Sequence, residues 1–176
     1  AVVTVVLYVV WLDPNLGVGD DVVGAFQESL GDPHLVMLGI LFLFAVVHSG
    51  GAALRPQAER VLGARAYRVL FAGASLPLAV TSVVYFINHR YSGVPLWDLR
   101  GVPGVHDAVW WTSLVSFLFL YPSTFNLLEV AAVDEPRVHL YETGIMRITR
   151  HPQAVGQGLW CAAHTLWVGN SFMVVT

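Results

Sequence analysis

Two histidines and the only cysteine of the chain lie within strongly apolar segments, where polar side chains are costly to bury. His48 stands in FAVVHSGGAAL, and Cys161 and His164 stand three residues apart in WCAAHTLWV. Residues three apart share a face of a helix, so Cys161 and His164 can reach the same ligand. Two neutral imidazoles on different helices can supply both axial positions of a haem iron, and a thiolate is an alternative ligand. The pattern predicts a metal or haem site formed by these three residues.

Each of these residues also has a purely structural interpretation. A lone histidine in a membrane helix can bridge two helices by a hydrogen bond, and a free cysteine often packs as a small apolar residue. The residue types alone leave both interpretations open.

The turn RITRHP precedes the last apolar segment and predicts a different kind of site. Pro152 suits the first position of a helix and disfavours helical geometry at His151. The exposed amides of a helix start attract anions, and Arg147 and Arg150 add positive charge beside them. The turn is therefore expected to bind a carboxylate or a phosphate, such as a haem propionate or the carboxylate of S-adenosylmethionine. A plain basic flank of a membrane span is the alternative. Arg68, expected near the same side, is a further candidate for binding the cofactor.

His151 lies thirteen residues before His164, which is roughly 20 Å along a helix. These two histidines therefore cannot bind one iron, and a metal on His151 would belong to a second site. Asn126 and Glu129, three residues apart in YPSTFNLLEV, are weaker polar candidates within an apolar segment.

The elements that carry these residues are long apolar blocks. The chain has 176 residues, of which 56% are hydrophobic and 12% charged, about half the charge of a soluble domain. Four blocks have about 20 residues or more, the length needed to cross a bilayer, and a short block opens the chain. The blocks span residues 1–12, 35–54, 66–87, 108–133 and 153–175. They lack period-two alternation, so helices are expected. The predicted fold is all-α: a polytopic integral membrane bundle with about five spans and one domain over residues 1–176, the first span belonging to a longer helix.

The connections between the blocks predict an orientation and a surface helix. Alternate connections carry seven arginines on one side and two on the other, so the positive-inside rule distinguishes the two sides. The segment 20–30 predicts a short surface helix with Val22, Val23, Phe26 and Leu30 turned to lipid. The remaining aromatic and histidine candidates are interpreted as interfacial or solvated. The tryptophans fitting an aromatic belt are Trp11, Trp97, Trp110 and Trp111. The histidines expected in loops or at helix ends are His34, His89, His106 and His139.

A single cysteine excludes internal disulfides, cysteine-based zinc sites, iron–sulfur clusters and covalent C-x-x-C-H haem attachment. The H-E-x-x-H motif and the histidine clusters of membrane di-iron oxygenases are also absent from the sequence. Neither a metalloprotease nor a desaturase is therefore predicted.

Several long strings of the sequence resemble one family. These strings are FAVVHSG, RAYRVLFAGASLPLAV, VYFINHRY, GVPGVH, FLYPSTFNLLEVAAVDEP, ETGIMRITRHPQ and WCAAHTLWVGN. They are similar to the 15-cis-zeta-carotene isomerases, plastid enzymes of plants and algae that are related to the bacterial NnrU-like membrane proteins. The similarity extends from about Val10 to Asn170, nearly the whole chain.

The resemblance implies a redox-regulated integral membrane isomerase of carotenoid biosynthesis with non-covalent haem b. It would convert 9,15,9'-tri-cis-zeta-carotene into the 9,9'-di-cis isomer by rotation about the 15–15' double bond. By matching positions, His48 and His164 resemble the family's haem-ligand histidines, and Cys161 resembles its alternative ligand. One axial ligand is expected to leave on reduction and to free the iron.

The resemblance also implies a plastid (chloroplast) membrane and a transit peptide that is not in this chain. The expected partners are a hydrophobic polyene from the bilayer, membrane lipid and an electron donor that the sequence does not identify. No nucleic acid is expected.

Two other functions fit parts of the same sequence. The pattern T-G-x-x-R-x-x-R-H-P-x-x-x-G, from Thr143 to Gly156, resembles a signature of membrane S-adenosylmethionine-dependent methyltransferases. A haem protein of electron transfer or sensing, without substrate turnover, is the third possibility.

Overall fold

The computed structural model describes residues 4–5, 7–13, 15, 17–123 and 144–176. Its regular elements are helices, so the predicted all-α class is confirmed for this part of the chain. The chain forms two compact units, residues 1–94 with 175–176 and residues 95–174. The expected single membrane domain remains a prediction.

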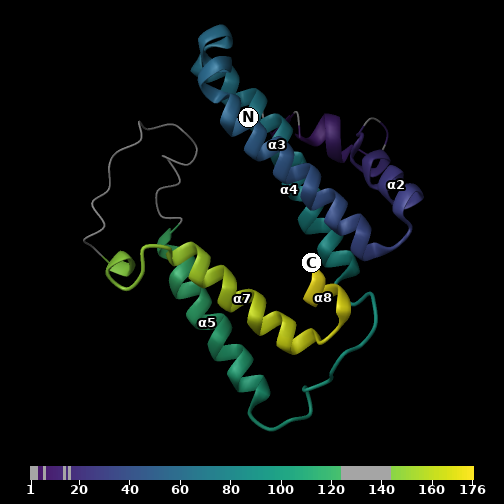
Figure 1. The fold of residues 1–176 in the computed structure, drawn as a ribbon, viewed down its shortest axis with the longest axis vertical. Coiled ribbons are helices and arrows are strands. Elements are labelled where there is room, and N and C mark those ends of the chain that lie inside the picture. The colour runs from purple at the N-terminus through teal and green to yellow at the C-terminus, as the bar shows by residue number, and fades with distance from the viewer. Residues whose placement is uncertain (1–3, 6, 14, 16, 124–143) are drawn as a thin grey trace. The chain divides into compact units, whose positions relative to one another are not determined.

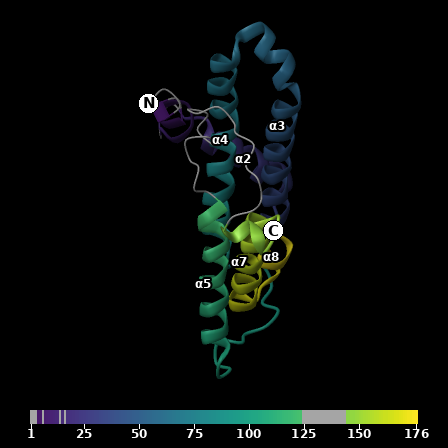
Figure 2. The same cartoon turned by 90° about the vertical axis from the view of Figure 1, so that its left-hand side faces the viewer.

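The first unit is built on a hairpin of two long helices, α3 (Pro33–Leu62) and α4 (Ala64–His89). They lie side by side in opposite directions (Figure 1, Figure 2). Both are long and apolar enough to cross a bilayer, and they are the two such helices among the described residues. They cover the predicted blocks 35–54 and 66–87, whereas the total of about five spans remains a prediction.

The ends of α3 are defined by local chemistry. The Asp32 carboxylate accepts hydrogen bonds from the amides of His34 and Leu35, and Pro33 occupies the first turn. Desolvation raises the pKa of Asp32, but these hydrogen bonds and the His34 ring outweigh it, so the pKa lies below its ordinary value. At the other end Gly63 has a φ of 81°, which a residue with a Cβ rarely adopts, and the chain reverses there into α4.

A shorter helix, α2 (Gly19–Leu30), confirms the helix predicted over residues 20–30. Phe26, on the apolar face of α2, packs against α3. A Cβ at Gly39 of α3 would lie 2.8 Å from the Phe26 ring and 3.3 Å from Leu30, so this glycine provides the notch into which α2 packs. Phe26 is half-buried there, and the orientation of this helix face toward lipid remains a prediction.

The chain before α2 includes a π-helix, η1 (Leu7–Leu12). Its Trp11 is fixed to the hairpin, because the indole Nε1 donates a hydrogen bond of 2.6 Å to Thr81 Oγ1 of α4. Trp11 is thus a packing residue of the first unit, where the sequence predicted a membrane-belt residue.

The second unit is built on α5 (Val105–Ser123) and α7 (Pro152–Val168), with the 3-10 helix η2 (Gly144–Arg147) before α7. The two long helices are antiparallel neighbours (Figure 1, Figure 2). They approach closely at Gly156, where an added Cβ would lie 2.9 Å from the Ser116 carbonyl oxygen and 2.7 Å from Leu120 Cγ. The buried Ser116 hydroxyl donates to the Gly156 carbonyl at 2.7 Å.

The expected single helix over residues 153–175 is wrong, because the chain forms two helices there. Gly169 adopts a left-handed conformation with a φ of 63° and ends α7. The side chain of Asn170 then accepts a hydrogen bond of 2.8 Å from the Met173 amide and begins α8 (Ser171–Val175). The predicted block 108–133 begins at Val105 in α5, and its residues beyond 123 lie outside the described part.

The segment 95–100 closes the end of α7. The amides of Leu96 and Trp97 donate to the Gly169 carbonyl at 2.8 and 3.1 Å, and Trp97 Nε1 donates to the Leu166 carbonyl at 3.0 Å. Carbonyls at a helix end lack partners within the helix, so these bonds stabilise the end of α7. Trp97 therefore caps a helix, where the sequence predicted a belt residue.

Two glycines of α7 test the close approach of α5 and α7. Gly156→Ala should destabilise the protein by about 1–3 kcal/mol, because the new Cβ meets the backbone of α5. Gly158→Ala, two residues along the same helix, should be neutral or stabilising by up to about 1 kcal/mol, because a Cβ there has no neighbour within 4 Å. Thermal unfolding in detergent, followed by circular dichroism, measures both. Equal losses in the two variants would contradict the close contact.

Candidate functional site

His48 lies on α3, and its ring is oriented by the partner helix of the hairpin. Its Nδ1 lies 2.8 Å from the hydroxyl of Ser75, a buried residue of α4. The rings of Phe44 and Phe71 flank it with centroids 5.3 and 5.2 Å away. Its Nε2 makes no hydrogen bond to any residue that the structure describes. One nitrogen is therefore held in place, and the other is available to a ligand.

The space for this arrangement comes from Gly51, one turn further along α3. An added Cβ at Gly51 would lie 2.7 Å from the Phe71 ring, and the Tyr67 hydroxyl donates to the Gly51 carbonyl. Tyr67 and Phe71 are stacked with centroids 5.9 Å apart. The aromatic side chains of α4 thus reach the backbone of α3 beside His48.

His164 lies on α7, and its own helix fixes its tautomer. The ring Nδ1 lies 2.8 Å from the Trp160 carbonyl oxygen. A carbonyl only accepts hydrogen bonds, so Nδ1 carries the proton, and the Nε2 of the neutral ring carries the lone pair. The Trp160 ring stacks on the imidazole with centroids 3.6 Å apart and an interplanar angle of 24°. This is the arrangement that prepares a histidine to bind a metal through Nε2.

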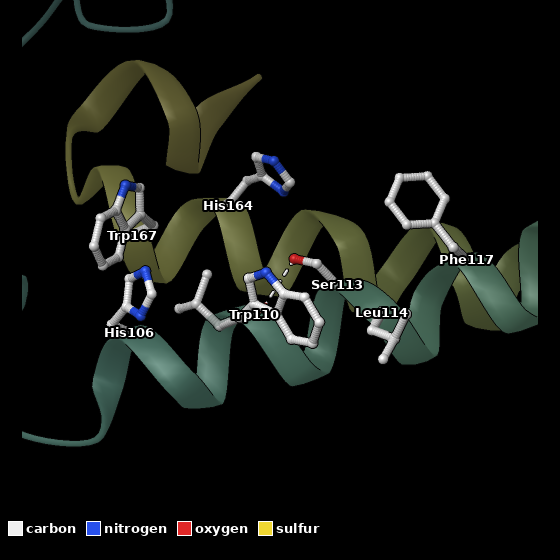
Figure 3. Close-up of a pocket in the computed structure, with 8 residues that line it drawn as sticks. His106, Trp110, Ser113, Leu114, Phe117, His164 and Trp167 are labelled. Carbon is white, nitrogen blue, oxygen red and sulfur yellow. Dashed lines mark hydrogen bonds between the residues drawn. The ribbon is translucent and has the colours of Figure 1, made fainter.

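A pocket of about 440 Å³ lies between α5 and α7 and includes His164 in its lining. We call it the α5–α7 pocket, and Figure 3 shows its residues along the two helices. Its lining is mainly aromatic and aliphatic, as in sites for flat apolar ligands. Within the described part of the chain the lining residues are His106, Val109, Trp110, Ser113, Leu114, Phe117, His164 and Trp167.

Cys161 shares α7 with His164, three residues away, as the spacing predicted. Its side chain is exposed, and its Sγ lies 3.8 Å from Gln157 Nε2. Cys161 is not among the residues that line the α5–α7 pocket. The thiol is free, and its role as an iron ligand remains a prediction.

The three predicted ligands are divided between the two units. His48 belongs to the first unit, and Cys161 and His164 belong to the second. Their joint binding of one iron remains a prediction. Among the described residues there is no group of three or more histidine, cysteine, aspartate or glutamate side chains placed to bind a metal.

The predicted anion site at the start of α7 has the expected backbone. Pro152 is the first helical residue, and His151 before it has a φ of −129° and a ψ of 58°. No side chain of the described residues caps this helix start, and the side chains of Arg147, Arg150 and His151 are exposed. The helix start is confirmed, whereas anion binding there remains a prediction.

The other predicted candidates contribute less to the described structure. Arg68 lies on the surface of α4, where its Nε donates to the Ala64 carbonyl at 3.1 Å, and its role in cofactor binding remains a prediction. Asn126, Glu129 and Thr143 lie outside the described residues.

The sequence interpretation missed two residues of the pocket. His106 was expected to be solvated or capping, and Trp110 was expected in a membrane belt, yet both line the pocket with His164. The signal was present in the spacing, because residues 106, 110, 113 and 117 follow one face of a helix.

The described part of the chain is helical and contains an apolar hairpin. Each of its two units has one histidine whose Nδ1 is held by a hydrogen bond and whose Nε2 can accept a ligand. Residues 36–176 match the family described as NnrU protein, and the chain belongs to this family. It is 61% identical over 170 residues to a protein of Arabidopsis thaliana named "15-cis-zeta-carotene isomerase, chloroplastic". It is also 61% identical over 173 residues to a Zea mays protein of the same name.

These alignments cover 97% and 98% of the chain but 46% and 47% of the two relatives. The chain therefore spans about half the length of the curated relatives that it matches. No solved structure matches the chain significantly.

The tautomer of His164 is directly testable. Proton–nitrogen correlation spectra of the histidine-labelled protein, at a pH where the ring is neutral, should place the proton on Nδ1, because the Trp160 carbonyl can only accept. His164→Gln identifies the resonance. Trp160→Ala keeps the carbonyl and should keep the tautomer. A proton on Nε2 in the native protein would contradict the structure.

Proposed function

We propose that this chain carries a carotenoid cis–trans isomerase activity, acting on the 15–15' double bond of 9,15,9'-tri-cis-zeta-carotene. The observation that carries this proposal is the 61% identity, over nearly the whole chain, to two proteins named 15-cis-zeta-carotene isomerase. The product would be the 9,9'-di-cis isomer, and the reaction has no net change of oxidation state.

We infer that the chain holds haem b without a covalent bond. The support is chemical: His164 offers Nε2 with a lone pair, and it does so beside a pocket with apolar and aromatic walls. His48 offers a second Nε2, with Nδ1 held by Ser75. Imidazole nitrogens of this kind are common axial ligands of haem iron. Bound haem would supply an iron centre that lowers the bond order of a polyene in contact with it.

Each of these residues would have a separate role in holding the haem. His48 and His164 would hold the iron, and their fixed Nδ1 atoms would keep the rings in orientation. Cys161 would be an alternative to one of the histidines as a ligand in the oxidised protein, because a thiolate favours ferric iron, so the ligand set would depend on the redox state. The apolar walls of the α5–α7 pocket would exclude water from the site.

The site of action follows from the substrate and from the hairpin. A long hydrocarbon dissolves in the bilayer, and α3 and α4 have the length and composition of membrane spans. The two relatives are named chloroplastic. We therefore propose an integral protein of a plastid membrane, which takes its substrate from the lipid and electrons from a donor still to be identified.

One feature favours a second candidate function. The start of α7 is uncapped among the described residues and has Arg147 and Arg150 nearby, as a site for the carboxylate of S-adenosylmethionine would require. Purified protein with a haem absorption band and no binding of S-adenosylmethionine would exclude the methyltransferase. Haem without turnover of tri-cis-zeta-carotene under reducing conditions would support electron transfer or sensing instead.

Substitution of the histidines tests the proposal. His48→Ala and His164→Ala should each lose most of the haem and the isomerisation together, because each removes an axial ligand. The measurements are the haem-to-protein ratio and the conversion of tri-cis-zeta-carotene under reducing conditions. Cys161→Ser should keep haem but alter the ferric spectrum. Full haem retention in both histidine variants would refute the assignment, and an unchanged ferric spectrum would remove Cys161 from it.

The hydroxyl that orients His48 provides a subtler test. Ser75→Ala should weaken haem binding by about tenfold, since loss of a group that orients a ligand typically has an effect of this size. Ser82→Ala is the matched control, because the Ser82 hydroxyl on the same helix bonds only to the Leu78 carbonyl. Haem titration of both proteins measures the effect. Equal affinities would mean that Ser75 does not act through His48.

A further inference from the structure

One end of the α5–α7 pocket is bounded by two basic side chains that meet at Trp167. The Trp167 ring lines the pocket, and the His106 ring stands edge-on to it with centroids 5.7 Å apart (Figure 3). Arg100 approaches the same indole, with its guanidinium carbon 5.9 Å from the ring centroid. Arg100 Nε also donates to the Trp167 carbonyl at 3.4 Å. The guanidinium is therefore held beside the pocket.

The rest of the guanidinium remains available for a ligand. Its two terminal nitrogens make no hydrogen bond or ion pair within the part of the chain that the structure describes. Two carboxylates lie close to these residues, and each is bonded to a group other than the Arg100 guanidinium and His106 Nε2. Asp98 accepts from the Arg100 backbone amide at 3.1 Å, and Asp107 lies 3.3 Å from His106 Nδ1.

The backbone adds positive potential at the same end. Helix α5 begins at Val105, so the partial positive charge of its start lies at His106. The C-terminal carbonyls of α7 would oppose an anion here, but Leu166 and Trp167 already accept hydrogen bonds from Trp97 and Arg100. The positive groups at this end are therefore the Arg100 guanidinium and the start of α5, whereas Asp98 and Asp107 are bonded to the Arg100 amide and to His106 Nδ1.

Distance along α7 relates this basic end to His164. Trp167 lies three residues beyond His164, one turn or about 4.5 Å along the axis. Pro152, at the other end of the helix, lies twelve residues before His164, or about 18 Å. A ligand bound at Nε2 of His164 thus has one cationic group within one turn, whereas Arg147 and Arg150 lie before the far end of the helix.

We propose that Arg100 and His106 form a carboxylate site at this end of the α5–α7 pocket, and that the site anchors the propionates of a porphyrin whose body lies in the pocket. The inference rests on the haem of the proposed function. Arginine matches a carboxylate with two parallel hydrogen bonds, and the aromatic walls suit a flat conjugated ring. The anchor therefore lies at the end of α7 opposite to Arg147 and Arg150.

Metal-free protoporphyrin IX and its dimethyl ester test the site without iron chemistry. Both are titrated against the full chain in detergent and followed by porphyrin fluorescence. Arg100→Gln should weaken binding of the acid by about tenfold, the size expected for a charged hydrogen bond. Binding of the ester, which has no carboxylate, should not change. Arg65→Gln, which removes an exposed arginine of α4, is the matched control and should affect neither porphyrin, whereas Arg150→Gln tests the competing anion site before α7.

The outcomes separate this inference from the proposed function. Unchanged affinity of Arg100→Gln for the acid, or a loss in Arg150→Gln instead, would overturn the Arg100–His106 site even if haem binds through His164. An Arg100-dependent preference for the acid would support the site, even if the haem spectrum were insensitive to His48 and His164 and the proposed ligands were wrong. A native protein that binds neither porphyrin would overturn the Arg100–His106 site and would leave the proposed function to its own test, the haem-to-protein ratio of the histidine variants.

Discussion

At Gly156 the backbone of α7 lies against α5, because no side chain separates the two helices there. The hydrogen bond from Ser116 to the Gly156 carbonyl fixes this contact. The helices are antiparallel, so moving from Gly156 toward His164 on α7 means moving from Ser116 toward His106 on α5. The side chains along that path are large, and they fill the interface only partly. The pocket beside His164 is therefore a consequence of tight packing at one end and bulky aromatic residues at the other.

The two prepared histidines use different partners, and the difference has chemical consequences. A serine hydroxyl can donate or accept, so Ser75 orients His48 without deciding which ring nitrogen carries the proton. The Trp160 carbonyl can only accept, so His164 has a defined tautomer and a defined lone pair. His48 also depends on a second helix, whereas the partners of His164 lie within its own helix.

Much of the fold followed from patterns that reflect local physics. The lengths of α3 and α4 follow from uninterrupted apolar runs, and the start of α7 follows from Pro152. The end of α7 did not follow, because Gly169 lies in an apolar run and its conformation depends on contacts with Trp97. The notch at Gly39 that receives Phe26 likewise depends on a second helix. Hydropathy describes the composition of each segment by itself. It therefore does not predict contacts of this kind, which depend on which segments pack against each other.

The same limit applies to the site. His48, Cys161 and His164 were identifiable because a polar residue within an apolar run is unusual, and no structure is needed to notice it. His106 and Arg100 border a polar connection, where basic residues are ordinary, so nothing in their local sequence distinguishes them. The packing of the segment 95–100 on the end of α7 brings Arg100 to Trp167, and the packing of α5 on α7 brings His106 there. Helix α7 thus has arginines at both ends, and its length prevents one ligand at His164 from using both sets. The two ends can bind different anions, so an uncapped helix start at Pro152 and a carboxylate site at Arg100 are compatible features of one chain.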